Sequence, residues 1–364
     1  MKKLGVSVYP ERSTYEKDAA YLELAAKYGY KRVFTSLLQI NGDQEEVVGN
    51  FKRVIGKANE LGMEVMVDMN PALFAQLGVS YDDLSFFHDL GAYGVRLDEG
   101  FSGLEEARMT RNPYNLKIEI NMSQGTPYVD NIMTFSPNRE NLMGSHNFYP
   151  RRYTGLSVDY FNQATAIYTK YRLNTAAFIN APSGTFGAWP VQDGMCTIED
   201  HRTLPIETQV AHYKMLDTID DLLIANAYAS EAELKAAADE FNAPEPGIHV
   251  ELTPGISAAE EAVVFAEGQT YRGDHSAYQI RSTNERGKQP ASDFPAHHTE
   301  PIKAGDLLID NVGYDRYAGG LQIALKPMVN DGRVNVVGRI VPEEMFLLAS
   351  LKPWAGFRLV KANH

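Results

Sequence analysis

Several features that mark whole classes of protein are missing from this 364-residue sequence. Cys196 is the only cysteine, so no intramolecular disulfide can form. Lysine and arginine number 34 against 47 acidic residues, and the formal net charge is -13. That balance argues against a nucleic-acid partner or an anionic membrane surface. In addition, no apolar run approaches the roughly 20 residues of a membrane span. From the charge and from this observation, we expect neither nucleic acid nor membrane among its partners.

The N-terminus gives no sign of a secretory signal. The apolar run after Lys3 is broken by Pro10, Glu11 and Arg12. It therefore ends before the roughly 7–15 apolar residues that a signal peptide requires. Together with the single cysteine, this predicts a cytoplasmic protein.

Several motifs that would identify a reaction are also missing. No G-x-G-x-x-G follows the first predicted strand, which disfavours a dinucleotide fold. The absence of G-x-S-x-G and of a glycine-rich lysine loop disfavours serine hydrolysis and nucleotide triphosphate use. The nine histidines include no H-E-x-x-H pattern, so we predict no metal site.

Short β-rich segments alternate with helical patterns over the first two thirds of the chain. The predicted helices include residues 16–29 and 45–62, and Gly62 suits a helix C-terminus. Eight strand-helix units of this kind predict a (β/α)8 barrel of the TIM type rather than an open sheet. The predicted strands are residues 4–11, 32–38, 64–71, 94–100, 116–123, 146–150, 175–182 and 221–230.

The pattern changes after the proline- and glycine-containing stretch 242–247. Beyond it, short strands separated by turn residues predict a small all-β domain. We therefore expect a barrel domain over residues 1–241 and a β domain over residues 248–364.

Polar residues share one face of several predicted barrel strands. Side chains alternate along a strand, so the apolar set faces the helices and the polar set faces the barrel interior. Active sites of such barrels lie at the C-terminal ends of the strands. The inward-facing acids are Glu11, Asp68, Asp98 and Glu119.

These acids allow two interpretations, because an unpaired buried charge is costly. Low in the barrel, Glu119 suits an internal salt bridge with Arg96 or Lys117. At the C-terminal ends, Glu11, Asp68 and Asp98 suit catalysis or substrate binding. Glu99 has the opposite parity to Asp98, so we expect it to begin a loop.

Loops after the later strands supply further candidates. Residues 146–157 mix aromatic, amide and cationic groups that suit a sugar ring, although Phe148 could equally belong to the core. Arg202, in the long loop before the eighth strand, could bind phosphate or pair with Glu199. Arg281 of the second domain is a further candidate for a pocket.

Together, residues 5–11, 83–101, 146–157, 196–205, 224–230 and 278–283 resemble the bacterial 6-phospho-N-acetylmuramidases. The resemblance runs nearly end to end and in order. It implies a TIM-like barrel followed by a cyclophilin-like domain. It also implies a cytoplasmic glycosidase of peptidoglycan recycling that cleaves the β-1,4 bond between N-acetylmuramic acid 6-phosphate and N-acetylglucosamine. No cofactor is implied.

Glycoside hydrolysis usually requires two carboxyl groups. With this activity in view, we predict catalysis by Asp98 and Glu11, with Glu119 as third choice. A phosphorylated amino-sugar disaccharide also needs amide and cationic contacts. For substrate binding we predict Asp68, Asn121, His146, Asn147, Arg151, Asn180, Arg202, Asn226 and Arg281.

Two other functions remain open from the sequence. One is a Schiff-base aldolase or lyase acting on a sugar phosphate, because Lys117 has inward parity on the fifth predicted strand. The other is a carbohydrate-binding protein without catalytic activity.

Overall fold

In the computed structural model, the chain is described over residues 2–37, 44–70, 73–74, 76–188, 190–191, 193–282 and 284–362. It divides into two compact units. The barrel unit comprises Met1–Gln209 and Thr218–Phe241, and the second unit comprises Val210–Asp217 and Asn242–His364. Leu38, Pro71 and Thr283, which fall within predicted strands or motifs, lie outside the described residues.

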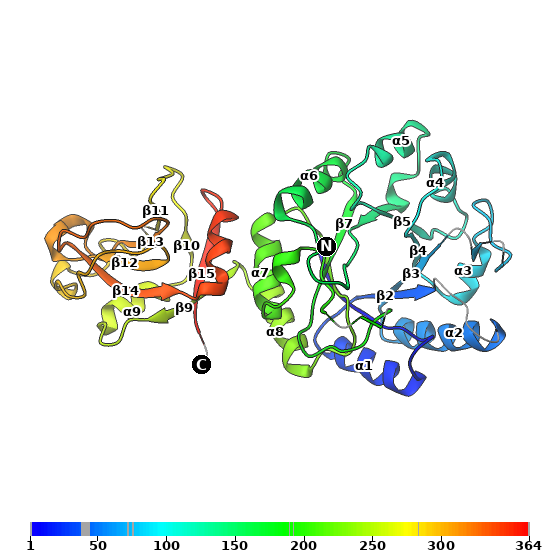
Figure 1. The fold of residues 1–364 in the computed structure, drawn as a ribbon, viewed down its shortest axis with the longest axis horizontal. Coiled ribbons are helices and arrows are strands. Elements are labelled where there is room, and N and C mark those ends of the chain that lie inside the picture. The colour runs from blue at the N-terminus through cyan, green and yellow to red at the C-terminus, as the bar shows by residue number, and fades with distance from the viewer. Residues whose placement is uncertain are drawn as a thin grey trace. The chain divides into compact units, whose positions relative to one another are not determined.

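The predicted fold class is confirmed, since eight parallel strands close into a barrel and helices surround it (Figure 1). The strands are β1 Lys3–Ser7, β2 Arg32–Leu37, β3 Glu64–Met69, β4 Gly94–Leu97, β5 Lys117–Asn121, β6 Leu142–Ser145, β7 Asn174–Ile179 and β8 Asp221–Ile224. The helices are α1 Tyr15–Lys27, α2 Gln44–Glu60, α3 Ser85–Leu90, α4 Leu104–Met109, α5 Tyr128–Thr134, α6 Val158–Thr169, α7 Ile206–Leu216 and α8 Glu231–Asn242. β1 pairs with both β2 and β8, which closes the ring.

Local sequence signals account for several of these elements. Thr14 and Ser157 cap α1 and α6 by accepting hydrogen bonds from backbone N–H groups of the first turn. Gly62 has φ +70° just after α2, the left-handed conformation expected of a helix C-terminus. Gly94 permits close strand pairing, because a Cβ there would meet the Lys117 carbonyl oxygen at 2.5 Å.

The sixth strand was predicted wrongly. β6 is Leu142–Ser145, where Gly144 pairs with both β5 and β7, and residues 146–150 form the segment that follows it. The strand contains no β-branched residue, so its sequence signal is weak. A Cβ on Gly144 would meet the Tyr168 ring at 2.9 Å, so packing favours glycine here.

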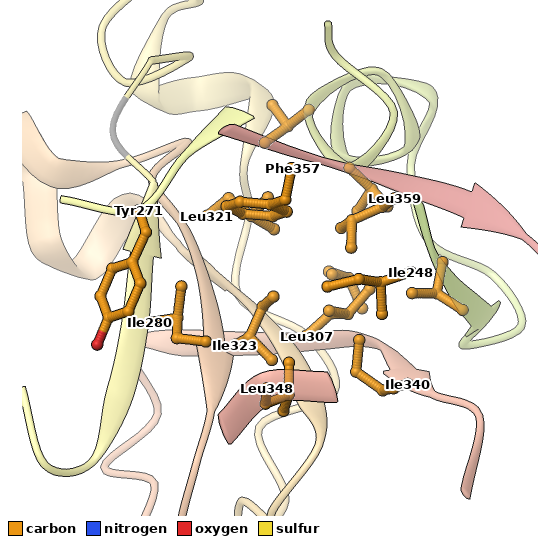
Figure 2. Close-up of a cluster of buried hydrophobic side chains, with 14 of the residues drawn as sticks. Ile248, Tyr271, Ile280, Leu307, Leu321, Ile323, Ile340, Leu348, Phe357 and Leu359 are labelled. Carbon is orange, nitrogen blue, oxygen red and sulfur yellow. The ribbon is translucent and has the colours of Figure 1, made fainter. Parts of the chain in front are cut away.

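The second unit contains a seven-stranded sheet in the order β10-β15-β9-β14-β12-β13-β11. Its elements are β9 Gly247–Leu252, α9 Ala258–Val264, β10 Gln269–Thr270, β11 Gln279–Ser282, β12 Asp306–Asp310, β13 Leu321–Ala324, β14 Val334–Ile340 and β15 Gly356–Lys361. One face carries the main apolar core, in which Ile248, Leu307, Ile323 and Phe357 meet (Figure 2). Leu308 and Val336 belong to a smaller, separate apolar cluster.

Candidate active site at the C-terminal end of the barrel

A pocket of about 130 Å³ opens at the C-terminal ends of the barrel strands. Its wall combines two carboxylates, one guanidinium, an amide, a hydroxyl and an aromatic ring. These groups come from β2, β3 and β4 and from the segments after β4, β6 and β7. The lining residues are Ser36, Asp68, Arg96, Asp98, Asn147, Phe148 and Ala188.

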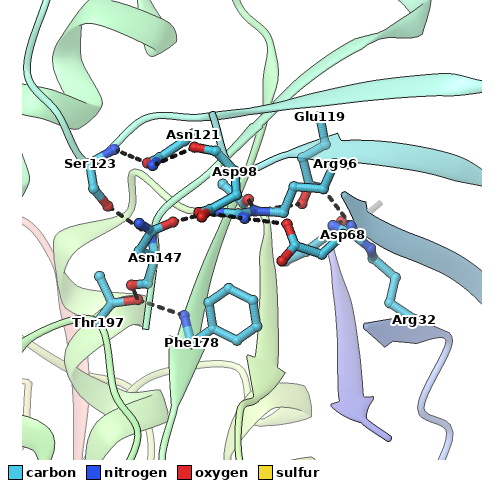
Figure 3. Close-up of polar contacts among 12 residues, drawn as sticks. Arg32, Asp68, Arg96, Asp98, Glu119, Asn121, Ser123, Asn147, Phe178 and Thr197 are labelled. Atoms are coloured by element: carbon cyan, nitrogen blue, oxygen red, sulfur yellow. Dashed lines mark hydrogen bonds and ion pairs between the residues drawn. The ribbon is translucent and has the colours of Figure 1, made fainter. Parts of the chain in front are cut away.

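Arg96 on β4 organises this pocket (Figure 3). Its Nη1 atom lies 2.6 Å from Asp68 Oδ1 and 3.4 Å from Asp98 Oδ1. Its Nε donates to Ser145 Oγ at 2.8 Å, and its Nη2 donates to Asn147 Oδ1. The guanidinium therefore has partners on every side, and its orientation is fixed.

Deeper in the barrel, Arg32 on β2 joins two acids. Its guanidinium forms ion pairs with Glu119 at 2.6 Å and Asp221 at 2.9 Å, and all three side chains are 1% exposed. Glu119 also lies 3.9 Å from Arg96 Nε. The structure thus places Glu119 in an internal ion-pair network, the structural alternative considered for it.

Asp68 and Asp98 differ in their contact with solvent. The Asp68 side chain is 5% exposed, whereas that of Asp98 is 38% exposed. Burial raises the pKa of Asp68 to about 6, although Arg96 opposes this shift. Asp98 combines a cationic neighbour with access to the pocket, which a carboxylate that touches a substrate requires. Glu99 is exposed beside it, as expected.

Glu11, four residues beyond β1, is a largely buried carboxyl group without a hydrogen bond to its Oε2 atom. Burial raises the pKa of Glu11 to about 7. Tyr9 lies nearby: burial raises the pKa of its phenol, and the charges of Glu11 and Asp68 raise it further. Glu11 is thus protonated in part at neutral pH. The charges of Glu11 and Asp68 both act on Tyr9.

A chain of amide and hydroxyl contacts supports Asp98 and Asn147 (Figure 3). Asn121 Nδ2 donates to the Asp98 carbonyl oxygen at 3.3 Å. Ser123 Oγ accepts from the Asn147 backbone N–H at 2.8 Å, and Thr197 Oγ1 donates to the Asn147 carbonyl at 2.9 Å. Asn147 lines the pocket itself, and Asn121 contacts the backbone of the pocket residue Asp98.

His146, Asn180 and Asn226 are buried within the structure that surrounds the site. His146 contacts Ser123 and Thr165, and burial lowers the pKa of its imidazole to about 3. The side chains of Asn180 and Asn226 bond to backbone groups of the segment that follows β7, at Ala181, Gly184, Met195 and Arg202. The side-chain hydrogen bonds of Asn180 and Asn226 therefore stabilise loops.

The predicted phosphate-binding arginines occupy three different environments. Arg202 pairs with Glu199 through two nitrogens, at 2.8 and 2.6 Å, and donates to the carbonyls of Tyr149 and Gly194. Arg151 is exposed on the segment after β6. Arg281 lies on β11 of the second unit and pairs with Asp274 at 2.7 Å.

Lys117 is the first residue of β5 and so lies at the opposite end of that strand from the pocket. Its Nζ donates to Asn141 Oδ1 at 2.8 Å and to the Glu140 carbonyl at 3.1 Å. An imine-forming lysine would need to reach the C-terminal end, so this position does not favour the lyase alternative.

Sequence reasoning missed Arg32 and Ser36. Both lie on β2 with the parity of Phe34. The Phe34 ring packs against the rings of Phe148 and Phe178, with centroid-to-centroid distances of 5.9 and 5.2 Å. A cation that begins an otherwise apolar strand was the available signal. Applying strand parity to β2 would have placed Arg32, Phe34 and Ser36 in the barrel interior.

Within the described ranges, no group of three or more His, Cys, Asp or Glu side chains could hold a metal ion. Among the helices described, none has the length and apolar character needed to cross a membrane.

Comparison with known proteins adds a family and two structures. The family described as 6-phospho-N-acetylmuramidase, N-terminal, matches residues 4–239, and its C-terminal counterpart matches residues 246–360. The crystal structure of an uncharacterized B. cereus protein is 42% identical over 99% of both chains, with a TM-score of 0.88. A conserved Enterococcus faecalis protein of unknown function is 23% identical over 99% of this chain and 97% of its own, with a TM-score of 0.72, which shows the fold alone. No curated protein sequence matches the chain.

Proposed function

The chain belongs to the 6-phospho-N-acetylmuramidase family, and from this premise we propose that it hydrolyses the β-1,4 bond between N-acetylmuramic acid 6-phosphate and N-acetylglucosamine. The observation that carries this proposal is the Asp98 carboxylate, which is paired with Arg96 and 38% exposed in a pocket at the C-terminal end of the barrel. Substrate is bound there in barrels of this fold.

Two carboxyl groups in different environments suit the two roles of glycoside hydrolysis. Asp98, which lies 3.4 Å from Arg96 Nη1, is the carboxylate that attacks the sugar or activates water. Glu11, whose pKa is raised to about 7 by burial, donates a proton to the leaving oxygen. Asp68 remains bound to Arg96 and fixes the guanidinium that positions Asp98. Glu119 acts through its ion pair with Arg32 and has no direct part in the reaction.

Recognition of the sugar falls to the amide and aromatic groups of the pocket. Asn147 presents its side chain beside Arg96, and Phe148 supplies an apolar surface for a sugar ring. Both precede Arg151 on the same segment, and Arg151 is exposed. We assign phosphate binding to Arg151 rather than to Arg202, because each guanidinium nitrogen of Arg202 already has a partner.

The physiological role follows from the substrate. A phosphorylated muramyl disaccharide is a fragment of peptidoglycan, so its hydrolysis would serve peptidoglycan recycling in the cytoplasm. The single buried cysteine is compatible with a reducing compartment.

Product analysis tests the proposal. The protein is incubated with the phosphorylated and the unphosphorylated muramyl-glucosamine disaccharide, and the products are resolved by mass. Release of N-acetylglucosamine and N-acetylmuramic acid 6-phosphate from the phosphorylated compound is expected. Binding of the disaccharide without release of either sugar would support the non-catalytic alternative instead.

A further inference from the structure

The second unit contains a cavity of its own, about 400 Å³ in volume. This volume lies within the range of roughly 300–1,000 Å³ typical of pockets for small molecules. All of its lining residues belong to the second unit, and the proposed hydrolysis uses none of them, although the sequence offered Arg281 as a substrate contact.

Strand parity explains which side chains line this cavity. Leu307 and Ile309 of β12 and Ile323 of β13 enter the main core on one face of the sheet. The alternate residues Leu308 and Gln322 line the cavity, which therefore lies on the other face. The apolar part of its wall continues a small buried cluster that contains Leu308.

The cavity has an excess of positive charge, in a chain whose net charge is -13. Arg272, Arg281 and Arg286 line it, with Asp310 as the acidic residue among the lining side chains. Arg272 and Arg281 share a single carboxylate, that of Asp274, at 2.7 Å from each. Two guanidinium groups are therefore held close together with one neutralising charge between them.

Arg286 and Asp310 extend this arrangement. Arg286 packs over the Tyr317 ring, with its Cζ atom 5.1 Å from the ring centroid. It forms no hydrogen bond with any residue in the described part of the chain. Asp310 accepts a hydrogen bond from Gln322 at 2.8 Å, and burial raises the pKa of its carboxyl to about 6, against the opposing charge of Arg286. The cavity thus offers unused guanidinium donors together with an Asp–Gln pair beside an apolar wall.

We propose that this cavity binds a small phosphate monoester that carries a hydroxylated ring. Arg281 and Arg286 bind the phosphate, since guanidinium groups match phosphate oxygens in charge and geometry. Asp310 and Gln322 bind hydroxyl groups, and Leu308 supports the ring. This inference is independent of the glycosidase activity, because the residues of the barrel pocket have no part in it.

Isothermal titration calorimetry of the full chain with N-acetylglucosamine 6-phosphate tests the inference. Arg286→Ala and Arg281→Ala are the cavity variants. The matched control is Lys361→Ala, which also removes one cation from the second unit but lies outside the cavity lining. Arg286 has no hydrogen bond to lose, so its substitution removes only its contact with the Tyr317 ring and its charge beside Asp310, and it is expected to shift the thermal midpoint little.

The inference predicts that each cavity variant weakens binding by about tenfold or more, the effect of losing about 1.4 kcal/mol, whereas Lys361→Ala binds as the parent does. Unphosphorylated N-acetylglucosamine is expected to bind at least tenfold more weakly than its 6-phosphate. Equal affinity in all four proteins, or no binding of the phosphate ester at millimolar concentration, would overturn the inference. Loss of binding in Arg151→Ala with retention in both cavity variants would place the ligand in the barrel and overturn it as well.

Discussion

Arg96 Nη1 lies 2.6 Å from Asp68 Oδ1, which joins the adjacent strands β3 and β4 at the base of the barrel pocket. Both side chains are almost completely buried. The same nitrogen reaches Asp98 Oδ1 at 3.4 Å, so one guanidinium fixes two carboxylates. Asp68 has its charge compensated within the protein, while Asp98 keeps part of its surface open to the pocket.

Substituting Arg96 with lysine tests this organising role. Lysine cannot reproduce the fork that contacts Asp68, Ser145 and Asn147 together. Loss of the hydrogen bonds to Ser145 and Asn147, at roughly 1.5–3 kcal/mol for each bond to a charged group, should lower the free energy of unfolding of Arg96→Lys by about 3–5 kcal/mol in urea titrations. The control is Arg108→Lys, since Arg108 pairs with Asp82 at the surface and should tolerate the change. Equal stability of both variants would contradict the role given to Arg96.

Strand parity predicted which acids point into the barrel, because side chains alternate between the two faces of a strand. Asp68, Arg96 and Glu119 all meet inside it. Parity does not say how the residues pair, since partners are set by register between strands distant in sequence. Parity applied to β2 would have placed Arg32 in the barrel interior, but it would not have identified Arg32 as the principal partner of Glu119.

Glu11 should make stability depend on pH. Its pKa is about 7 in the folded protein against a usual value of 4.5. Between these values the folded state binds more protons than the unfolded state, so stability falls as pH rises through this range. Glu11→Gln removes this dependence, and we expect it to be more stable than the parent at pH 8 by on the order of 1–3 kcal/mol, with little difference at pH 4.

Thermal or urea unfolding at pH 4, 6 and 8 measures this difference. The same variant should lose most of its hydrolytic activity, since glutamine cannot donate a carboxyl proton, and the parent activity should decline above about pH 7. A Glu11→Gln protein that hydrolyses the disaccharide at the parent rate would show that Glu11 is not the acid.

The two arginines considered for phosphate binding should respond differently to removal. Arg202→Ala breaks contacts with Glu199 and two backbone carbonyls, so it should destabilise the barrel unit by about 3 kcal/mol. Arg151→Ala should leave stability unchanged and raise KM for the phosphorylated disaccharide by about tenfold. Steady-state kinetics with both disaccharides, together with urea titrations, separates the two effects. An unchanged KM in Arg151→Ala would assign the phosphate to another residue.

Loop contacts of this kind were beyond prediction from sequence. The sequence offered Glu199 as a partner of Arg202, and the structure contains this pair, whereas the carbonyl partners of Arg202 come from residues 149 and 194. Asn180 directly follows β7 and Asn226 lies two residues beyond β8, and both side chains bond to the backbone of nearby loops. Only the three-dimensional course of the loops determines such partners.

Lys117 should be dispensable for turnover. It lies at the start of β5 and donates to Asn141, so Lys117→Met is expected to change kcat by less than about twofold, with at most a small loss of stability. Borohydride added during turnover should give no covalent adduct. Trapping of substrate on Lys117, identified by peptide mass, would favour the Schiff-base reaction.

The assignment of Asp98 is the central claim, and its neighbour provides the control. Asp98→Asn and Glu99→Gln each neutralise one carboxylate, but Asp98 lines the pocket and Glu99 is exposed outside its lining. The decisive measurement is kcat/KM of both variants on the phosphorylated disaccharide. We predict that Asp98→Asn lowers it by a factor on the order of 10²–10⁴, while Glu99→Gln stays close to the parent. Equal activity of the parent and Asp98→Asn would contradict the account.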